Sequence, residues 1–216
     1  TKVMSAAAEF EGYPLSPEWG DNGDSEAVSS DSGSVAMSVF IGRALSALSQ
    51  PDHGLMRKVN RWRAPRWFRW WMLLATRAGD GWLWGIIGLA VLCSSATARF
   101  DAIEAAGGAV VAGVALFLAA KRMFRRTRPR DIEPHCWAQI QTRDMFSFPS
   151  GHSTTAFAVA LSLGSFFPET MPVLLLLAAN VAASRVILGM HFLSDVIVGS
   201  GCGALLGYLA FRLAAV

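Results

Sequence analysis

Long apolar runs constrain this chain more than any other feature. They alternate with charged or proline-containing loops that cannot lie in lipid. The composition agrees, since 53% hydrophobic and 16% charged residues are unusual for a soluble protein. We predict an all-α integral membrane helical bundle with about five transmembrane helices. The predicted crossings are residues 82–98, 102–120, 153–167, 172–189 and 192–214.

The first 81 residues differ from the apolar core. Residues 1–34 carry seven acidic side chains and one base, Lys2, and are rich in Gly and Ser, which predicts a disordered tail. Residues 35–81 are predicted as interfacial, amphipathic helices. Within them, residues 57–71 alternate Arg and Lys with Trp, a pattern that fits nucleic acid or the lipid headgroup zone. Because apolar runs follow directly, we expect this segment to lie in the headgroup zone and not to bind nucleic acid. Residues 82–216 are then the predicted transmembrane core.

Counting the predicted crossings places three polar segments together. If the second crossing ends on one side, the loop after it lies there, and the fourth crossing returns to the same side. The segments that meet at this face are Lys121–Arg130, Pro149–His152 and Ser184–Asp195. A sixth crossing within residues 35–77 is the alternative, and it would move the N-terminal tail to the opposite side.

The first two of these segments are suited to an anion. Pro149, Ser150 and Gly151 lead into a predicted helix whose N-terminal N–H groups favour negative charge. His152, next to them, can move a proton near neutral pH. Lys121 and Arg128 can grip phosphate oxygens, although a basic patch for acidic lipid headgroups explains their cluster equally well.

The third segment carries ionisable groups where two apolar runs meet, a costly location that indicates function. If residues 191–195 are helical, His191 and Asp195 lie on one face. Asp195 can then hold one ring nitrogen of His191 and leave the other free to attack. A purely structural His–Asp pair is the alternative. Arg185, six residues before His191, favours the functional interpretation.

Together these residues resemble the type 2 phosphatidic acid phosphatase (PAP2) superfamily, which includes bacterial lipid phosphatases and vanadium haloperoxidases. The pattern is Lys-x6-Arg-Pro from Lys121 to Pro129, Pro-Ser-Gly-His at 149–152, and Ser-Arg-x5-His-x3-Asp from Ser184 to Asp195. The resemblance covers about residues 75–212.

The resemblance implies a phosphatase with a phosphohistidine intermediate and no metal or cofactor. It assigns His191 as the nucleophile, Asp195 as the group that orients it, and His152 as the acid and base. The phosphate-binding residues would be Lys121, Arg128, Ser150, Gly151 and Arg185. The three cysteines, Cys93, Cys136 and Cys202, have no metal-ligand spacing.

The expected substrate is a phosphomonoester or pyrophosphate of a lipid-like molecule, because an amphiphile can present its headgroup to a site at the membrane face. The bacterial inner membrane is the expected location, and the excess of Lys and Arg favours a cytoplasmic site. The alternatives are a vanadate-dependent haloperoxidase and a non-catalytic lipid-headgroup binder or transporter. The oligomeric state does not follow from the sequence.

Overall fold

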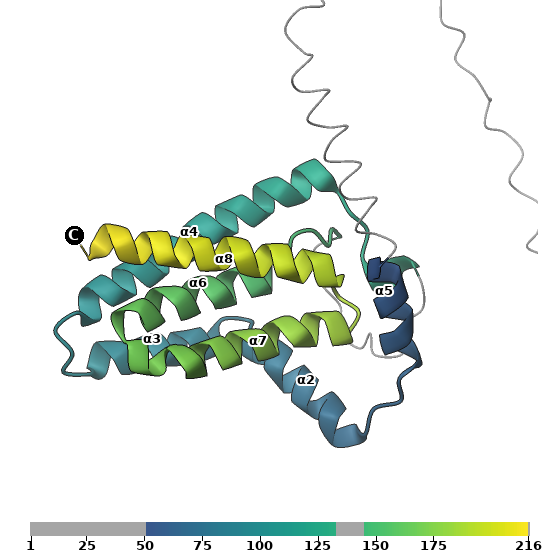
Figure 1. Cartoon of the computed structure of the whole chain (residues 1–216), viewed down its shortest axis with the longest axis horizontal. Helices are drawn as coiled ribbons and strands as arrows, with labels where there is room; N and C mark the ends of the chain where they lie inside the picture. The colour runs from purple at the N-terminus through teal and green to yellow at the C-terminus, as the bar shows by residue number, and fades with distance from the viewer. Residues whose placement is uncertain (1–50, 133–144, 216) are drawn as a thin grey trace, which may run out of the picture. The chain divides into compact units, whose positions relative to one another are not determined.

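The structure, a computed structural model, describes residues 51–132 and 145–215. These residues form a bundle of α-helices, and no strand is present among them (Figure 1). The predicted acidic tail at 1–34 lies outside the described residues, as does the first part of the predicted interfacial segment, 35–50.

Each of the five predicted crossings coincides with a helix. They are α3 (Trp82–Cys93), α4 (Arg99–Phe124), α6 (Gly151–Phe166), α7 (Met171–Ile187) and α8 (Leu193–Ala214). Within the described residues, three helical stretches are long and apolar enough to cross a membrane: Arg99–Ile132, Pro168–Ile187 and Leu193–Ala214. Helices α3 and α6 are shorter, so the number of crossings stays a prediction.

Two predicted boundaries around α4 are wrong. The turn before it was predicted at residues 99–101, but α3 ends at Cys93, where the Ser94 hydroxyl donates to the Val91 carbonyl at 2.7 Å. This bond competes with continued helix formation. At its other end α4 extends to Phe124 and includes Lys121, which was predicted to begin a loop. The helix stops at Arg125, whose φ of 46° lies in the left-handed region.

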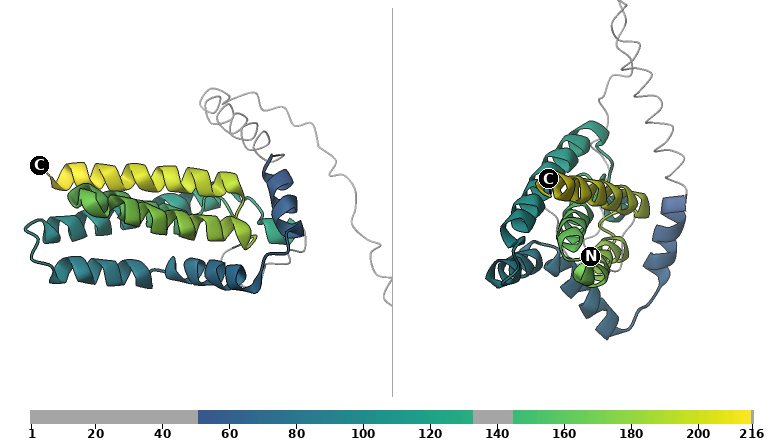
Figure 2. Two further views of the ribbon diagram at one scale, coloured as in Figure 1. Left: turned by 60° about the horizontal axis from the view of Figure 1, so that its bottom comes forward. Right: turned by 60° about the vertical axis from the view of Figure 1, so that its left-hand side comes forward.

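Helix α6 lies in the middle of the bundle and packs against α4, α7 and α8 (Figure 2, right). The contact with α8 depends on three glycines spaced four residues apart, Gly199, Gly203 and Gly207. A Cβ at any of them would collide with α6, at Gly199 with the Ser150 carbonyl at 2.7 Å. Gly201, between two of them in the sequence, has open space around it. Small residues thus allow the two backbones to approach closely.

Large apolar side chains lie on the outer surface of the bundle as well as in its core. Exposed examples are Ile86, Leu89, Val111, Leu176, Ile197 and Leu205, from α3, α4, α7 and α8. Water would penalise such a surface, whereas hydrocarbon would not. The outward face of the helices therefore suits a lipid environment.

The segment before the core is helical over residues 51–61 and again in α2 (Arg66–Ala78). Helix α2 is amphipathic: Trp67 and Trp70 are exposed, while Met72 and Thr76 are buried. It packs against α7, and the Trp71 indole donates to Asn180 Oδ1 at 3.1 Å. Exposed Trp beside Arg is typical of a headgroup zone, and the interfacial location of 35–81 stays a prediction.

Candidate active site

The predicted polar segments meet at one end of the bundle, on the right in Figure 1. The C-terminal ends of α4 and α7 and the N-terminal ends of α6 and α8 lie there. The short helix α5 (Pro129–Ile132) is at the same end. All eight predicted site residues lie on these ends and the loops beside them: Lys121, Arg128, Ser150, Gly151, His152, Arg185, His191 and Asp195.

His191 is held in the turn between α7 and α8. The backbone N–H groups of Met190 and His191 both donate to the Arg185 carbonyl, at 3.0 and 3.1 Å. Gly189 permits this turn because its φ of 66° is left-handed. The ring is buried, and its Nδ1 is 2.6 Å from the Ser147 carbonyl. A carbonyl can only accept, so Nδ1 carries the proton and Nε2 keeps its lone pair in the neutral ring.

Asp195 does not make the hydrogen bond we predicted for it. Its Oδ2 is 3.7 Å from His191 Nδ1, beyond hydrogen-bond range, and the Ser147 carbonyl takes that place. Asp195 instead accepts the Phe192 N–H at 2.9 Å, as a carboxylate in the first turn of α8. Asp195 therefore caps α8, the helix that follows His191. Its carboxylate lies near the His191 ring but makes no hydrogen bond to it.

Arg126 holds the other oxygen of this carboxylate. Its guanidinium donates to Asp195 Oδ1 at 2.6 Å and to the Ser194 hydroxyl at 2.7 Å, and it lies 4.1 Å from the centre of the Phe192 ring. It also pairs with Asp52 at 2.8 Å. Asp52 in turn accepts the backbone N–H and the hydroxyl of Ser194. The helix at 51–61 is thereby tied to the start of α8.

Arg128 is almost fully buried, and its guanidinium lies next to the His191 ring. It donates to the Met190 carbonyl at 2.7 Å and to the Phe146 carbonyl at 3.1 Å, and its Nη1 is 3.5 Å from His191 Nε2. The guanidinium therefore fixes the two loops relative to each other. It also places a permanent positive charge beside the nitrogen that keeps its lone pair.

Arg185 and Lys121 add two further buried cations. Arg185 donates to the Thr76 hydroxyl of α2 at 2.6 Å, and Lys121 lies 5.3 Å from the centre of the Phe117 ring. Burial first, and then the charges of Arg185, Arg128 and Lys121, hold the pKa of His191 well below its ordinary value of 6.5. The ring is therefore neutral at neutral pH, as a nitrogen nucleophile must be.

The Pro-Ser-Gly-His segment starts α6 and contacts α8 directly. The Ser150 N–H donates to the Asp195 carbonyl at 3.0 Å. Ser150 occupies the N-cap position, but its side chain caps no N–H group and instead accepts the Ser153 hydroxyl at 3.0 Å. Gly151 is buried against the Phe117 ring, 3.1 Å from where a Cβ would stand. The start of α6 is thus packed closely between α4 and α8.

His152 pairs with a residue that no sequence motif indicated. Its Nε2 is 2.8 Å from Oδ1 of Asp80, in the turn between α2 and α3. No sequence motif indicated four other contacts, those made by Ser147, Arg126, Asp52 and Thr76. Ser147 and Arg126 lie beside recognised motifs, which is a weak signal. Asp52 and Asp80 lie far from the motifs in the sequence and only the fold brings them close.

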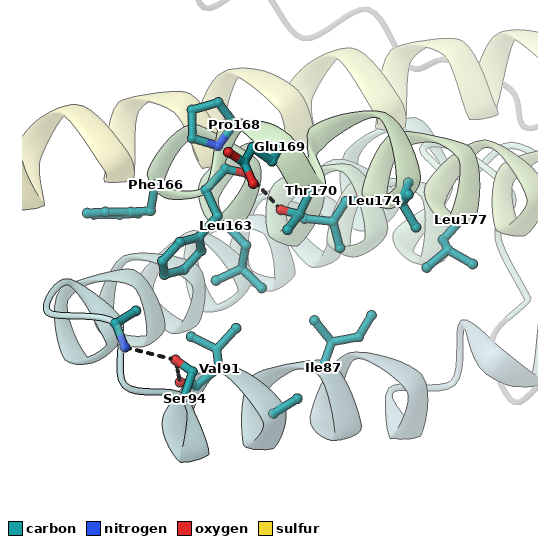
Figure 3. A pocket seen from close by; sticks show the side chains of 14 residues that line it. Ile87, Val91, Ser94, Leu163, Phe166, Pro168, Glu169, Thr170, Leu174 and Leu177 are labelled. Carbon is teal, nitrogen blue, oxygen red and sulfur yellow. Dashed lines mark hydrogen bonds between the residues drawn. The ribbon is translucent and has the colours of Figure 1, made fainter.

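The polar cluster is separate from an apolar cavity of about 800 Å³ (Figure 3). That cavity lies between Ile87 and Val91 of α3 and the side chains of Leu163, Phe166 and Leu174. These belong to the end of α6 and the start of α7, away from His152 and Arg185. Within the described residues, no group of His, Cys, Asp or Glu has the arrangement of a metal site.

The C-terminal half of the chain matches a known protein family. The model of the PAP2 superfamily matches residues 103–215, more than half of the chain. The chain belongs to the PAP2 superfamily. The match begins after Asp52, Thr76 and Asp80, so three contacts of the polar cluster come from outside the matched region.

The curated relatives are phosphatases named for lipid substrates. Decaprenylphosphoryl-5-phosphoribose phosphatase of Mycobacterium tuberculosis is 37% identical over 127 residues, which are 59% of this chain and 68% of the relative. Lipid A 1-phosphatase of Rhizobium johnstonii is 36% identical over 39% of this chain and 36% of the relative. Phosphatidylglycerophosphatase B of Bacillus subtilis is 35% identical over 41% and 46%.

Solved PAP2 structures share the fold. The transmembrane phosphatidylglycerolphosphate phosphatase of Bacillus subtilis superimposes with a TM-score of 0.63 and 22% identity, over 84% of this chain and 95% of the other. Aquifex aeolicus LpxE gives 0.59 and 23%, over 74% and 93%. This PAP2 protein is therefore an all-α integral membrane phosphatase.

Proposed function

We propose that this PAP2 protein hydrolyses a phosphomonoester or pyrophosphate of a lipid-like molecule through a phosphohistidine at His191. The observation that carries the proposal is the environment of the His191 ring. Its Nδ1 donates to the Ser147 carbonyl at 2.6 Å, and its Nε2 lies on the side of the Arg128 guanidinium. This tautomer leaves Nε2 as the nucleophile, beside a charge that attracts phosphate.

The reaction has two steps. His191 Nε2 forms a bond to phosphorus while the bond to the lipid oxygen breaks, and His152 gives that oxygen its proton. Water then attacks phosphorus, gives a proton to His152, and releases phosphate from His191. Burial and the nearby Arg185 lower the pKa of His152 in the free site. A bound phosphate dianion opposes this effect and favours the protonated form that the first step requires.

Lys121, Arg128 and Arg185 supply the positive charge that stabilises the transition state. The Ser150 hydroxyl and the Gly151 N–H, at the start of α6, add donors at a helix N-terminus. Three buried cations provide the charge that a divalent metal supplies in other phosphatases. We therefore propose that the reaction needs no metal ion or other cofactor.

Phosphate release from detergent-solubilised lipid phosphates tests this mechanism. The panel contains a polyprenyl-linked phosphosugar, a phosphatidylglycerophosphate and a lipid A 1-phosphate, the substrates named for relatives. We expect release from at least one, loss of it in His191→Ala, and no effect of EDTA. Brief reaction with a ³²P-labelled substrate and alkaline quenching should trap acid-labile label on the wild type and none on His191→Ala. Full activity of that variant would exclude the mechanism.

We also propose that the site faces the cytoplasm from the bacterial inner membrane, because Lys and Arg are concentrated at its end of the bundle. Met145, at the site end, is 79% exposed and suits a probe. Met145→Cys, in a chain whose three natural cysteines are replaced by serine, should react with an impermeant maleimide only after the cells are broken. Labelling of intact spheroplasts would place the site on the outer face.

A further inference from the structure

The carboxylate of Asp80 lies against the His152 ring. Its Oδ1 is 2.8 Å from His152 Nε2. An ionised carboxylate has no proton to donate, so His152 Nε2 carries the hydrogen and donates it. The other ring nitrogen, Nδ1, is then the one left to exchange a proton with a substrate.

The turn that carries Asp80 is held in place by packing. The Asp80 N–H donates to the Arg77 carbonyl at 3.0 Å, which continues the end of α2. At Gly79 a Cβ would stand 2.6 Å from Val181 Cγ1 and 3.1 Å from His152 Cδ2. The turn therefore packs closely against side chains of α6 and α7. A side chain at position 79 would crowd Val181 and His152, so this close packing supports the position of Asp80 beside His152.

We infer that Asp80 is a positioning residue that holds the His152 ring through Nε2 and presents Nδ1 to the departing lipid oxygen. This inference rests on the acid–base role proposed above for His152. Carboxylates hold histidines in this way in many sites, where they fix the tautomer and stabilise the charged ring. In the first step Nδ1 gives its proton to the oxygen, and in the second it receives one from water, while Nε2 stays bonded to Asp80.

Asp80 also counters the cations that face the same ring. Arg185 and Lys121 act against the charged form of His152, whereas Asp80 favours it through its charge and its hydrogen bond. Arg77, 3.6 Å from the other oxygen of Asp80, is exposed, and solvent weakens its effect. Loss of the Asp80 charge should therefore lower the pKa of His152.

Asp80→Asn tests the inference first by a measurement that needs no activity. The ring of His152 is followed by NMR in protein labelled with ¹³C-histidine, and its signal is assigned by its absence in His152→Ala. We expect the titration midpoint of His152 to move to lower pH in Asp80→Asn. It should stay in place in Asp101→Asn, the same change at an exposed residue in the first turn of α4. An unmoved midpoint in Asp80→Asn overturns the inference.

Kinetics provide the second test. In Asp80→Asn we expect kcat to fall about 10- to 100-fold, with KM within about twofold, and the high-pH limb of the kcat profile to move to lower pH. In a His152→Ala background the same substitution should cost nothing further, because Asp80 acts through His152. An equal loss in both backgrounds contradicts the inference.

The two tests separate this inference from the proposed function. If the wild type releases no phosphate from the panel but the His152 midpoint moves in Asp80→Asn, the pairing holds and the proposed reaction fails. If His191→Ala is inactive and Asp80→Asn keeps full kcat with an unmoved profile, the reaction holds and the role of Asp80 is wrong.

Discussion

Arg126 donates a 2.6 Å hydrogen bond to Asp195, the residue four positions after His191, and thereby anchors the start of α8. The same guanidinium pairs with Asp52 at 2.8 Å. The loop that carries the proposed nucleophile is consequently tied to the helix at 51–61 as well as to its own helices. This link involves a residue outside the region that the PAP2 model matches.

Replacement of Arg126 by Met should destabilise the protein strongly. Asp195 is fully buried and would lose its main cationic partner, and removing one member of a buried pair costs about 3–5 kcal/mol. We expect a lower Tm in detergent and a loss of phosphate release. Arg122→Met, at an exposed residue in the last turn of α4, is the matched control. Equal Tm values for the two variants would show that the pairing contributes little.

The low pKa of His191 predicts how activity and stability depend on pH. His191 should stay neutral below pH 6.5. The low-pH limb of the kcat/KM profile, where protonation of His191 stops the reaction, should therefore lie below pH 6.5. In the unfolded chain the ring takes up a proton near pH 6.5, and the folded protein does not. Stability should therefore fall as the pH drops below about 6.5, by up to about 1.4 kcal/mol per pH unit for this group. Chemical unfolding of wild type and His191→Gln between pH 7 and 5 checks this, since the variant should have a shallower slope.

The close contact of α6 with α8 predicts that Gly203→Ala is destabilising. A methyl group at Gly203 meets the Thr154 backbone, which cannot move without separating the two helices. We expect a loss of about 1–3 kcal/mol. Gly201→Ala, two residues away in open space, should retain wild-type stability. Thermal unfolding in the same detergent distinguishes the two. A comparable loss in both would point to packing against the surrounding detergent or lipid instead of the α6 contact, because Ala favours a helix more than Gly does.

Gly79→Ala should reduce activity more than stability. The added methyl group pushes the α2–α3 turn away from Val181 and His152, and a displaced turn withdraws Asp80. We expect at least a tenfold lower kcat, with a smaller effect on KM. Gly85→Ala, at a position in α3 with nothing within 4 Å, serves as the control. Wild-type kcat in Gly79→Ala would mean that the contact relaxes without cost.

The helical class and the grouping of the polar segments follow from the amino-acid sequence alone. Hydropathy located the five helices to within a few residues, except near Ser94 and Lys121, where hydrogen bonding and helix propensity moved the boundaries. The order of apolar runs was enough to place Lys121, His152 and His191 at one end, because each crossing reverses the direction of the chain. The roles of these residues stay predictions.

The partner of each histidine nitrogen, in contrast, is known only from the folded structure. The sequence predicted that Asp195 holds His191, since residues four apart share a helix face. In the structure the Ser147 carbonyl takes that place, Asp195 caps α8 and binds Arg126, and Asp80 binds His152. Hydropathy reports which segments lie in lipid. Hydrogen bonds depend on distances of a fraction of an ångström between segments remote in the sequence, and those are fixed by packing.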